Sequence, residues 1–341
     1  MDNLLVLALA VIAVGAIFYA CLPPKIRVHD KLQSAVLVTG TSSGLGRAIA
    51  LALAAKGYRK VFCGVRRLID APAEYSTCVP LVIDVTKPEA IANAVAEVNR
   101  LVEAEGLTLT AIVMNAGVTS MGAIEVVNIE RVRECFDVNV FGLLRVVQAF
   151  LPTLRAARGS RVVLIGSEAG MISPVFYGAY AASKFALEAI ADSLRAELLP
   201  YEVAVSLLQV GAHATAIVGK MSAQLEETTA SHAATHAAYG GGAPPEPAGA
   251  RLYEARLRSF LGLMSLSLRW NLLPSPAGPS AAVAHALGSA RPRCRYLVGL
   301  DAWAVWGVAR FVPSSLMDRL LLLLLPANGW GWLSRSSSAP R

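Results

Sequence analysis

The sequence predicts an α/β fold, a doubly wound parallel sheet that forms a single domain. Short apolar runs typical of buried strands recur along the chain, and stretches long enough for amphipathic helices separate them. A glycine-rich turn follows the first apolar run and leads directly into a helical pattern, which is the strand-turn-helix unit of such sheets. We expect this domain to cover residues 32–300.

The expected elements alternate in the order that a parallel sheet requires. Strands are predicted at 35–40, 60–65, 79–86, 111–117, 161–166, 203–210 and 295–299. Helices are predicted at 44–54, 91–101, 129–151 and 280–290, with a further helix carrying Tyr180 and Lys184. Each helix would carry the chain back across the sheet, so the carboxyl ends of the strands would share one edge.

Composition favours a membrane-proximal protein in a reducing compartment. Hydrophobic residues make up 55% of the 341 residues, and the net charge is +7. No nucleic-acid-binding pattern occurs, so we expect no nucleic acid and attribute the charge to an anionic membrane surface and an anionic cofactor. The five cysteines show no Cys-x-x-Cys spacing, which argues against a disulfide framework or a zinc site.

The first 24 residues predict a membrane anchor. Residues 4–22 are uncharged and mostly aliphatic, and as a helix they would span about 28 Å, the hydrocarbon thickness of a bilayer. Lys25, Arg27 and Lys31 follow this run, which favours a cytosolic orientation for the rest of the chain. We expect a single-pass N-terminal anchor in the endoplasmic reticulum membrane.

The turn after the first strand predicts a dinucleotide site. It has the spacing Gly40-x-x-x-Gly44-x-Gly46 and opens a helix. Glycines allow the backbone to approach a pyrophosphate closely, and the helix N-terminus supplies amide donors and positive potential. The expected contacts are made by seven consecutive residues: Gly40, Thr41, Ser42, Ser43, Gly44, Leu45 and Gly46.

The end of the second strand predicts a preference for NADP(H) over NAD(H). An NAD site would place an acidic residue here to accept the ribose hydroxyls, whereas this chain has Arg66 and Arg67. Two guanidinium groups suit a ribose 2′-phosphate. A solvated pair of arginines at a strand end is the alternative.

Ser167, Tyr180 and Lys184 predict chemistry that interconverts an alcohol and a carbonyl. Tyr180 and Lys184 are four residues apart and share a helix face, while Ser167 follows a buried strand. A neighbouring lysine cation favours the phenolate and would lower the pKa of Tyr180 toward the working range. Ser167 would then hold the substrate oxygen while Tyr180 moves its proton.

These motifs together resemble the short-chain dehydrogenases/reductases. The glycine turn is similar to that family's Thr-Gly-x-x-x-Gly-x-Gly, and Ser167 with Tyr180-x-x-x-Lys184 is similar to its catalytic signature. Asn115-Ala-Gly117 matches the family's Asn-Asn-Ala-Gly motif with Met114 at the first position. Residues 295–319 resemble the branch of retinol and hydroxysteroid dehydrogenases. The resemblance covers residues 35–319 and implies a Rossmann-type fold.

The resemblance also implies roles for individual residues. Asn139 would support a proton relay through ordered water to Lys184, although a kink or a satisfied core amide also explains an asparagine in an apolar helix. Tyr180 and Lys184 would also contact the cofactor. The remaining implied cofactor contacts are Asp84 at the adenine, Val85 beside it, Asn115, Ala116 and Gly117 in the turn, and Thr215 at the nicotinamide. Asp84 is equally suited to cap a helix, and Val210 replaces the proline that the family usually places before Gly211.

Two segments depart from the core pattern. Residues 217–273 contain a Gly/Pro-rich joint, and in this family such an insertion forms a lid over an apolar substrate. Residues 301–341 end in a leucine run with tryptophans, which suits a membrane interface; a dimer contact or a packed core is the alternative. His213, His232 and His236 show no third metal ligand, so no metal is expected.

The sequence therefore predicts a membrane-anchored, NADP(H)-dependent oxidoreductase that acts on a lipophilic alcohol, ketone or aldehyde of hydroxysteroid or retinoid type. The expected partners are this small-molecule substrate, membrane lipid and, as an open alternative, a second copy of the chain. Three further functions remain open. They are a 3-ketosphinganine reductase-like enzyme, a catalytically silent cofactor-binding membrane protein and a structural protein of the lipid surface.

Overall fold

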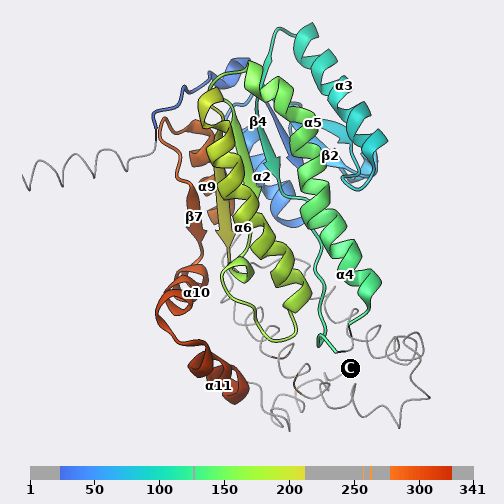
Figure 1. Ribbon diagram of the computed structural model, residues 1–341. Coiled ribbons are helices and arrows are strands. Elements are labelled where there is room, and N and C mark those ends of the chain that lie inside the picture. The colour runs from blue at the N-terminus through green and yellow to red at the C-terminus, as the bar shows by residue number, and fades with distance from the viewer. Residues whose placement is uncertain (1–23, 126, 212–255, 257–261, 263–276, 325–341) are drawn as a thin grey trace, which may run out of the picture.

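The computed structural model describes residues 24–125, 127–211, 256, 262 and 277–324. Its centre is one parallel sheet of seven strands in the order β3-β2-β1-β4-β5-β6-β7 (Figure 1). The strands are β1 Ser34–Thr39, β2 Lys60–Val65, β3 Cys78–Val82, β4 Thr108–Met114, β5 Arg161–Ile165, β6 Ala204–Val210 and β7 Arg295–Val298. The predicted parallel sheet and its seven strands are confirmed.

Both faces of the sheet are covered by helices, which explains why its strands are apolar throughout. β1, β2 and β5 are buried along their whole length. Ala35 and Leu37 of β1 belong to one core cluster, whereas Val36 and Val38 belong to another, because successive side chains of a strand point to opposite faces. The chain thus builds two hydrophobic layers around one sheet.

Each layer has its own helices. α3 (Pro88–Ala104), α5 (Leu143–Ala156) and α6 (Gly178–Leu198) pack into the first cluster, and α2 (Gly44–Ala55) and α9 (Ala277–Gly288) into the second. Figure 1 shows α3, α5 and α6 together on one side of the sheet. The strand order reverses between β1 and β4, and in open parallel sheets ligands bind at such a switch point, outside the carboxyl ends of the strands.

The predicted helix 129–151 is longer and irregular. It consists of α4 (Ile129–Phe136), a π-helical segment Asp137–Gly142 and α5. Asn139 thus lies in a π-helical segment that interrupts the helix, a feature that often lies at functional sites. In the described residues, Ile129–Ala156 is the one helix long and apolar enough to cross a membrane, but its apolar side chains, such as Phe150 and Leu154, lie in the core.

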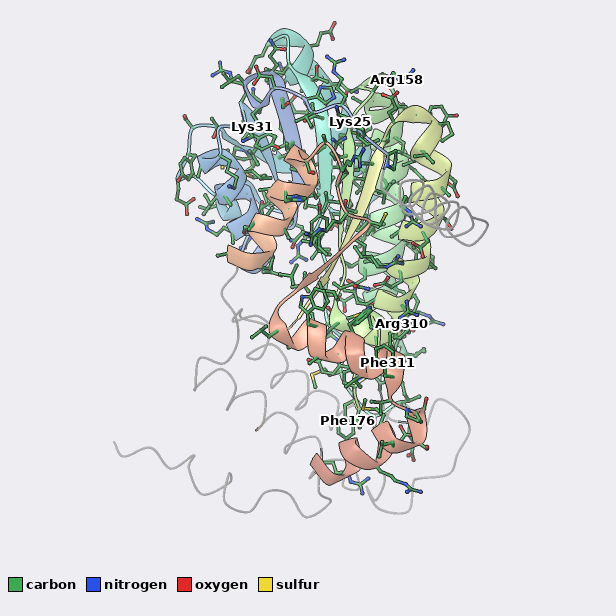
Figure 2. All side chains as sticks on the ribbon, turned by 90° about the vertical axis from the view of Figure 1, so that its left-hand side faces the viewer. Lys25, Lys31, Arg158, Phe176, Arg310 and Phe311 are labelled. Carbon is green, nitrogen blue, oxygen red and sulfur yellow. The ribbon has the colours of Figure 1, made fainter. Side chains whose placement is uncertain are left out.

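Two helices follow the last strand beyond the carboxyl edge of the sheet. α10 (Leu300–Phe311) and α11 (Ser314–Leu324) extend from β7 (Figure 1). α10 carries exposed apolar residues, with Leu300 89% and Phe311 78% exposed. Its aromatic rings contact each other edge to face, with centroids 6.1 Å apart for Trp303–Trp306 and 6.3 Å for Trp306–Phe311. In Figure 2, Phe311 lies at the opposite end of the molecule from Lys25 and Lys31.

The main difference from the predicted elements concerns the third strand. It was expected to continue to Thr86 but ends at Val82. Asp84 turns the chain, because its Oδ1 accepts hydrogen bonds from the Thr86 amide (2.9 Å) and hydroxyl (2.7 Å). Asp84 does not cap α3, whose N-cap residue is Lys87.

Several predictions lie outside the described residues. They concern the anchor at 4–22, most of the lid at 217–273, the tail from 325 to 341, Thr215, His213, His232 and His236.

Candidate active site

The turns after β1, β4 and β5 meet at the carboxyl edge of the sheet. Thr39 ends β1, and its side-chain oxygen accepts hydrogen bonds from the amides of Asn115 and Ala116, both at 3.0 Å. The Asn115 side chain donates in return to the carbonyls of Thr39 and Gly40, also at 3.0 Å. Asn115, predicted as a cofactor contact, therefore holds the glycine turn in place through its side chain.

Gly46 is required by this arrangement. A Cβ atom at Gly46 would lie 2.2 Å from the Gly40 carbonyl oxygen and 2.3 Å from the Asn115 Nδ2, closer than atoms can approach. Ser43 precedes α2 without capping it through its side chain. The first turn of α2 thus offers amide groups and positive potential to an anionic ligand at the predicted position.

The two arginines after β2 are not equivalent. Arg67 is paired with Asp70 through two hydrogen bonds, Nε to Oδ2 at 2.8 Å and Nη2 to Oδ1 at 2.9 Å. Arg66 is exposed and has no ion-pair partner in the part of the chain that the structure describes. Asp70 therefore occupies one of the two guanidinium groups predicted to bind the 2′-phosphate.

Val85 and Asp84 lie near the adjoining strand end. Val85 is buried against the π-helical segment, since a Cβ at Gly142 would lie 2.7 Å from the Val85 Cγ2. Asp84 is held by Thr86 and lies close enough to Arg66 for the guanidinium to favour its ionised form. These contacts fix the end of β3, where the adenine was predicted to bind.

Asn139 is buried and fully engaged. Its Oδ1 accepts from the Val118 amide at 2.8 Å, and its Nδ2 donates to the Val118 carbonyl at 2.9 Å and the Ser183 Oγ at 3.0 Å. Ser183 donates to the carbonyl of Tyr180 at 2.7 Å. Asn139 therefore links the turn after β4 to the helix that carries Tyr180 and Lys184.

Ser167, Tyr180 and Lys184 converge as the spacing predicted. The Ser167 hydroxyl is a hydrogen-bond partner of Tyr180 and accepts from the Ala169 amide at 3.1 Å. The Lys184 Nζ donates to the Ile165 carbonyl at 3.0 Å and lies 5.6 Å from the centroid of the Tyr180 ring. The hydroxyl of Ser167, the phenol of Tyr180 and the amino group of Lys184 thus lie close together at the end of β5.

Burial, however, reverses the expected change at Tyr180. Burial raises the pKa of Tyr180 to about 12, although the hydrogen bond with Ser167 opposes this. Burial also lowers the pKa of Lys184 to about 8. The predicted lowering of the Tyr180 pKa by lysine is wrong for this structure, because removing the phenol from water disfavours its anion more than the neighbouring groups stabilise it.

The site contains two carboxyl groups that sequence reasoning missed. Glu168 follows Ser167, and burial raises its pKa to about 7, with a further contribution from Asp301. The Asp301 carboxylate lies against Gly211, where a Cβ would be only 2.1 Å from its Oδ1. No local pattern in the sequence signals this pair, because Asp301 reaches the site only through the placement of α10.

Among the described residues, no group of three or more His, Cys, Asp or Glu side chains is arranged to hold a metal ion. The predicted histidines lie outside them.

The comparisons with known proteins agree on a single family. The family model described as short chain dehydrogenase matches residues 34–226. The NADPH-dependent 3-dehydrocapnine reductase of Ornithobacterium rhinotracheale is 40% identical over 192 residues, which are 54% of this chain and 67% of the relative. Retinol dehydrogenase 5 of Homo sapiens is 32% identical over 303 residues, covering 85% and 88% of the two chains.

A solved structure of a short-chain dehydrogenase from Streptomyces avermitilis has the same fold. It aligns with a TM-score of 0.62 and 28% identity, over 90% of this chain and 98% of the other.

The contacts of Gly46 lead to a prediction. Gly46→Ala should destabilise the protein by about 1–3 kcal/mol, because the Asn115 amide and the Gly40 carbonyl must move apart to accept the methyl group. Its dinucleotide affinity should fall at least about tenfold, which titration of cofactor fluorescence measures. Gly307→Ala is the control, since no atom lies within 4 Å of its added Cβ. Equal behaviour of the two variants would contradict the proposed crowding.

Proposed function

This chain belongs to the short-chain dehydrogenase/reductase family and to its branch of retinol and hydroxysteroid dehydrogenases, and we propose from this premise that it is an NADP(H)-dependent oxidoreductase for a lipophilic alcohol and its ketone or aldehyde. Action on alcohol groups follows from the family. The finer proposal rests on one observation: Ser167, Tyr180 and Lys184 meet at the carboxyl edge of the sheet, the edge that also carries the glycine turn.

In the proposed reaction, Tyr180 is the proton donor. Bound NADPH would supply a hydride to the carbonyl carbon, and the phenol of Tyr180 would protonate the carbonyl oxygen. Ser167, already a partner of Tyr180, would donate a hydrogen bond to that oxygen and orient it. The products are the alcohol, NADP⁺ and a tyrosinate that must be reprotonated.

Lys184 and Asn139 support this proton transfer. Lys184 would stabilise the tyrosinate by its charge and would bond the cofactor ribose, as the family resemblance implies. Asn139 would hold the relay that returns a proton to the site. Its side chain ties the β4 turn to α6, so a displaced Asn139 would also displace Tyr180.

The raised pKa of Tyr180 affects the pH dependence of the two directions differently. A phenol with a pKa of about 12 remains in the protonated state that a donor needs. Oxidation of the alcohol needs the phenolate instead, so it should require higher pH. We propose carbonyl reduction as the principal direction because the proposed cofactor is NADP(H).

Arg66 is the proposed selector of NADP(H). It follows β2 at the position where an NAD site would carry a carboxylate, and it has no ion-pair partner in the described chain. Asp70 holds Arg67, which leaves that guanidinium less available to a 2′-phosphate. The NADPH dependence named for the reductase of Ornithobacterium rhinotracheale supports the same choice.

The proposed substrate is of retinoid or hydroxysteroid type, in keeping with the likeness to retinol dehydrogenase 5 over most of both chains. A reductase of 3-ketosphinganine type is the second candidate, and the 40% identity with a protein named an NADPH-dependent reductase is compatible with it. Assaying detergent-solubilised protein with retinoid, steroid and sphingoid carbonyls, and with both reduced cofactors, distinguishes the two. Turnover of none of these would contradict the proposed substrate classes.

We also propose that the protein is membrane-associated, with residues 1–24 as the anchor and the helices after β7 at the lipid interface. The apolar run at 4–22 and the exposed Trp303, Trp306 and Phe311 of α10 support this. The endoplasmic reticulum and a cytosolic catalytic domain remain the proposed location, and residues 217–273 the proposed lid.

The role of Tyr180 gives the first prediction. Tyr180→Phe should lower kcat by about 10³-fold or more, because the proton donor is lost, whereas the Kd for NADPH should change by less than about threefold. Steady-state kinetics and fluorescence titration measure the two quantities. Tyr201→Phe, an exposed tyrosine outside the site, is the control and should retain activity. Undiminished turnover in Tyr180→Phe would rule out the assigned role.

The unequal arginines give the second prediction. Arg66→Ala should raise the KM for NADPH about tenfold or more and leave that for NADH nearly unchanged, because only NADPH carries the 2′-phosphate. Arg67→Ala should have a smaller effect, since Asp70 already binds its guanidinium. Comparing KM for both cofactors in both variants tests this. A similar loss for NADH and NADPH would remove the argument for cofactor selection.

The anchor gives the third prediction. Deletion of residues 1–24 should move the protein from the membrane pellet to the supernatant after a high-salt wash, because the apolar run at 4–22 is lost. Fractionation followed by immunoblotting measures the distribution. As a control for chain length, a full-length variant carries two arginine substitutions within the apolar run at 4–22. Unchanged retention of the deletion variant would show that residues 1–24 are not needed for membrane attachment.

A further inference from the structure

Glu168 is a buried carboxyl group that the proposed mechanism does not use. It lies directly after Ser167, at the start of the short 3₁₀ turn Glu168–Gly170. Its Oε2 is shielded from solvent and has no hydrogen-bond partner. An unpaired buried carboxylate is costly, so the group is held near its neutral form, and burial raises its pKa to about 7.

Two elements bring charged or titratable groups to Glu168. α10 contributes Asp301, whose negative charge also favours protonation of Glu168. The others are Tyr180 of α6 and Tyr177, the N-cap residue of that helix. The negative charge of Glu168 raises the pKa of both phenols, after the larger effects of burial and of one neighbouring group, which is Cys135 for Tyr180 and Tyr180 for Tyr177. The rings of these tyrosines contact each other edge to face, with centroids 5.7 Å apart.

The remaining charged groups of α6 near this turn have other partners. Lys184 donates to the Ile165 carbonyl at 3.0 Å. Glu188 lies beside Gly170, but it accepts hydrogen bonds from Gln209 at 2.8 Å and Arg295 at 2.9 Å. Neither group therefore neutralises Glu168. In the described structure, the charge of Glu168 acts on Tyr177 and Tyr180.

We propose that Glu168 is a positioning residue that sets the protonation of Tyr180 through its charge, and that Asp301 of α10 in turn sets the charge of Glu168. This inference rests on the proposed function, because it assigns a new residue to the same proton transfer. When Glu168 is ionised, its charge opposes formation of the Tyr180 phenolate. Oxidation of an alcohol requires that phenolate, so an ionised Glu168 raises the pH at which oxidation becomes effective.

The placement of Asp301 extends this control to the C-terminal helices. Its carboxylate packs on Gly211 at the end of β6, and α10 contacts the 3₁₀ turn of Glu168. A displacement of α10 would remove a negative charge from Glu168, which would then ionise at lower pH. The position of α10 is thereby coupled to the proton balance at Tyr180.

The pH profile of alcohol oxidation tests the proposal on the detergent-solubilised full chain. In Glu168→Gln, which keeps the shape of the protonated group, the rising limb of kcat/KM should shift to lower pH by about 0.5–1 unit. Glu197→Gln is the matched control, since Glu197 is an exposed carboxylate on α6, the helix that carries Tyr180. Superimposable profiles for wild type and Glu168→Gln, or equal shifts in the two variants, would overturn the proposal.

Thermal unfolding provides a test that does not need turnover. A carboxyl group with a raised pKa in the folded state favours folding while it is protonated, and this advantage is lost as the pH rises toward about 7. The Tm of wild type relative to Glu168→Gln should therefore fall between about pH 4.5 and 7 and stay constant above. A constant difference would overturn the proposal, even if the proposed substrates are never turned over.

Asp301→Asn keeps the proposal testable if Glu168→Gln does not fold. It removes the neighbouring charge, so the pH-dependent change in Tm assigned to Glu168 should move to lower pH by about 0.5 unit. No movement would show that Asp301 does not control Glu168 and would overturn that part of the proposal. Absent turnover with an intact shift in Tm would instead count against the proposed function alone.

Discussion

The desolvation of polar groups at the carboxyl edge of the sheet governs this site. Tyr180, Lys184 and Glu168 all carry pKa values displaced toward their neutral forms, and burial is the largest cause in each case. These buried polar groups stay in place because other contacts hold the surrounding turns. The hydrogen bonds of Asn115 and Asn139 provide this rigidity without adding charge. A preorganised site of weakly charged groups is well suited to a reaction in which a proton moves with a hydride.

The sheet and the convergence of its motifs followed from sequence because both depend on local pattern. Apolar runs identified all seven strands, and the spacing of Tyr180 and Lys184 placed them on one helix face. The glycine turn was equally readable, although the reason for Gly46 was not. Its need comes from Asn115, which lies far along the chain and reaches the turn only when β1 and β4 are paired.

The errors arose where distant segments or burial decide the outcome. The pairing of Arg67 with Asp70 depends on the local turn after β2, which composition alone does not fix. The pKa of Tyr180 was predicted from its lysine neighbour, but the loss of solvent has the larger effect. Glu168 and Asp301 gave no signal, because an acidic residue in a loop is normally solvated and α10 could not be placed from sequence.

The π-helical segment Asp137–Gly142 places one additional residue between α4 and α5. A π-helical turn accommodates one residue more than an α-helical turn, so the helices on either side can keep the orientations of a continuous α-helix. Excising a single residue here would return the segment to α-helical geometry and leave α4 and α5 nearly in place. It would, however, remove the local geometry that presents Asn139 to the amide and carbonyl of Val118. Related chains without the additional residue would therefore keep the fold but lose this link between the turn after β4 and α6.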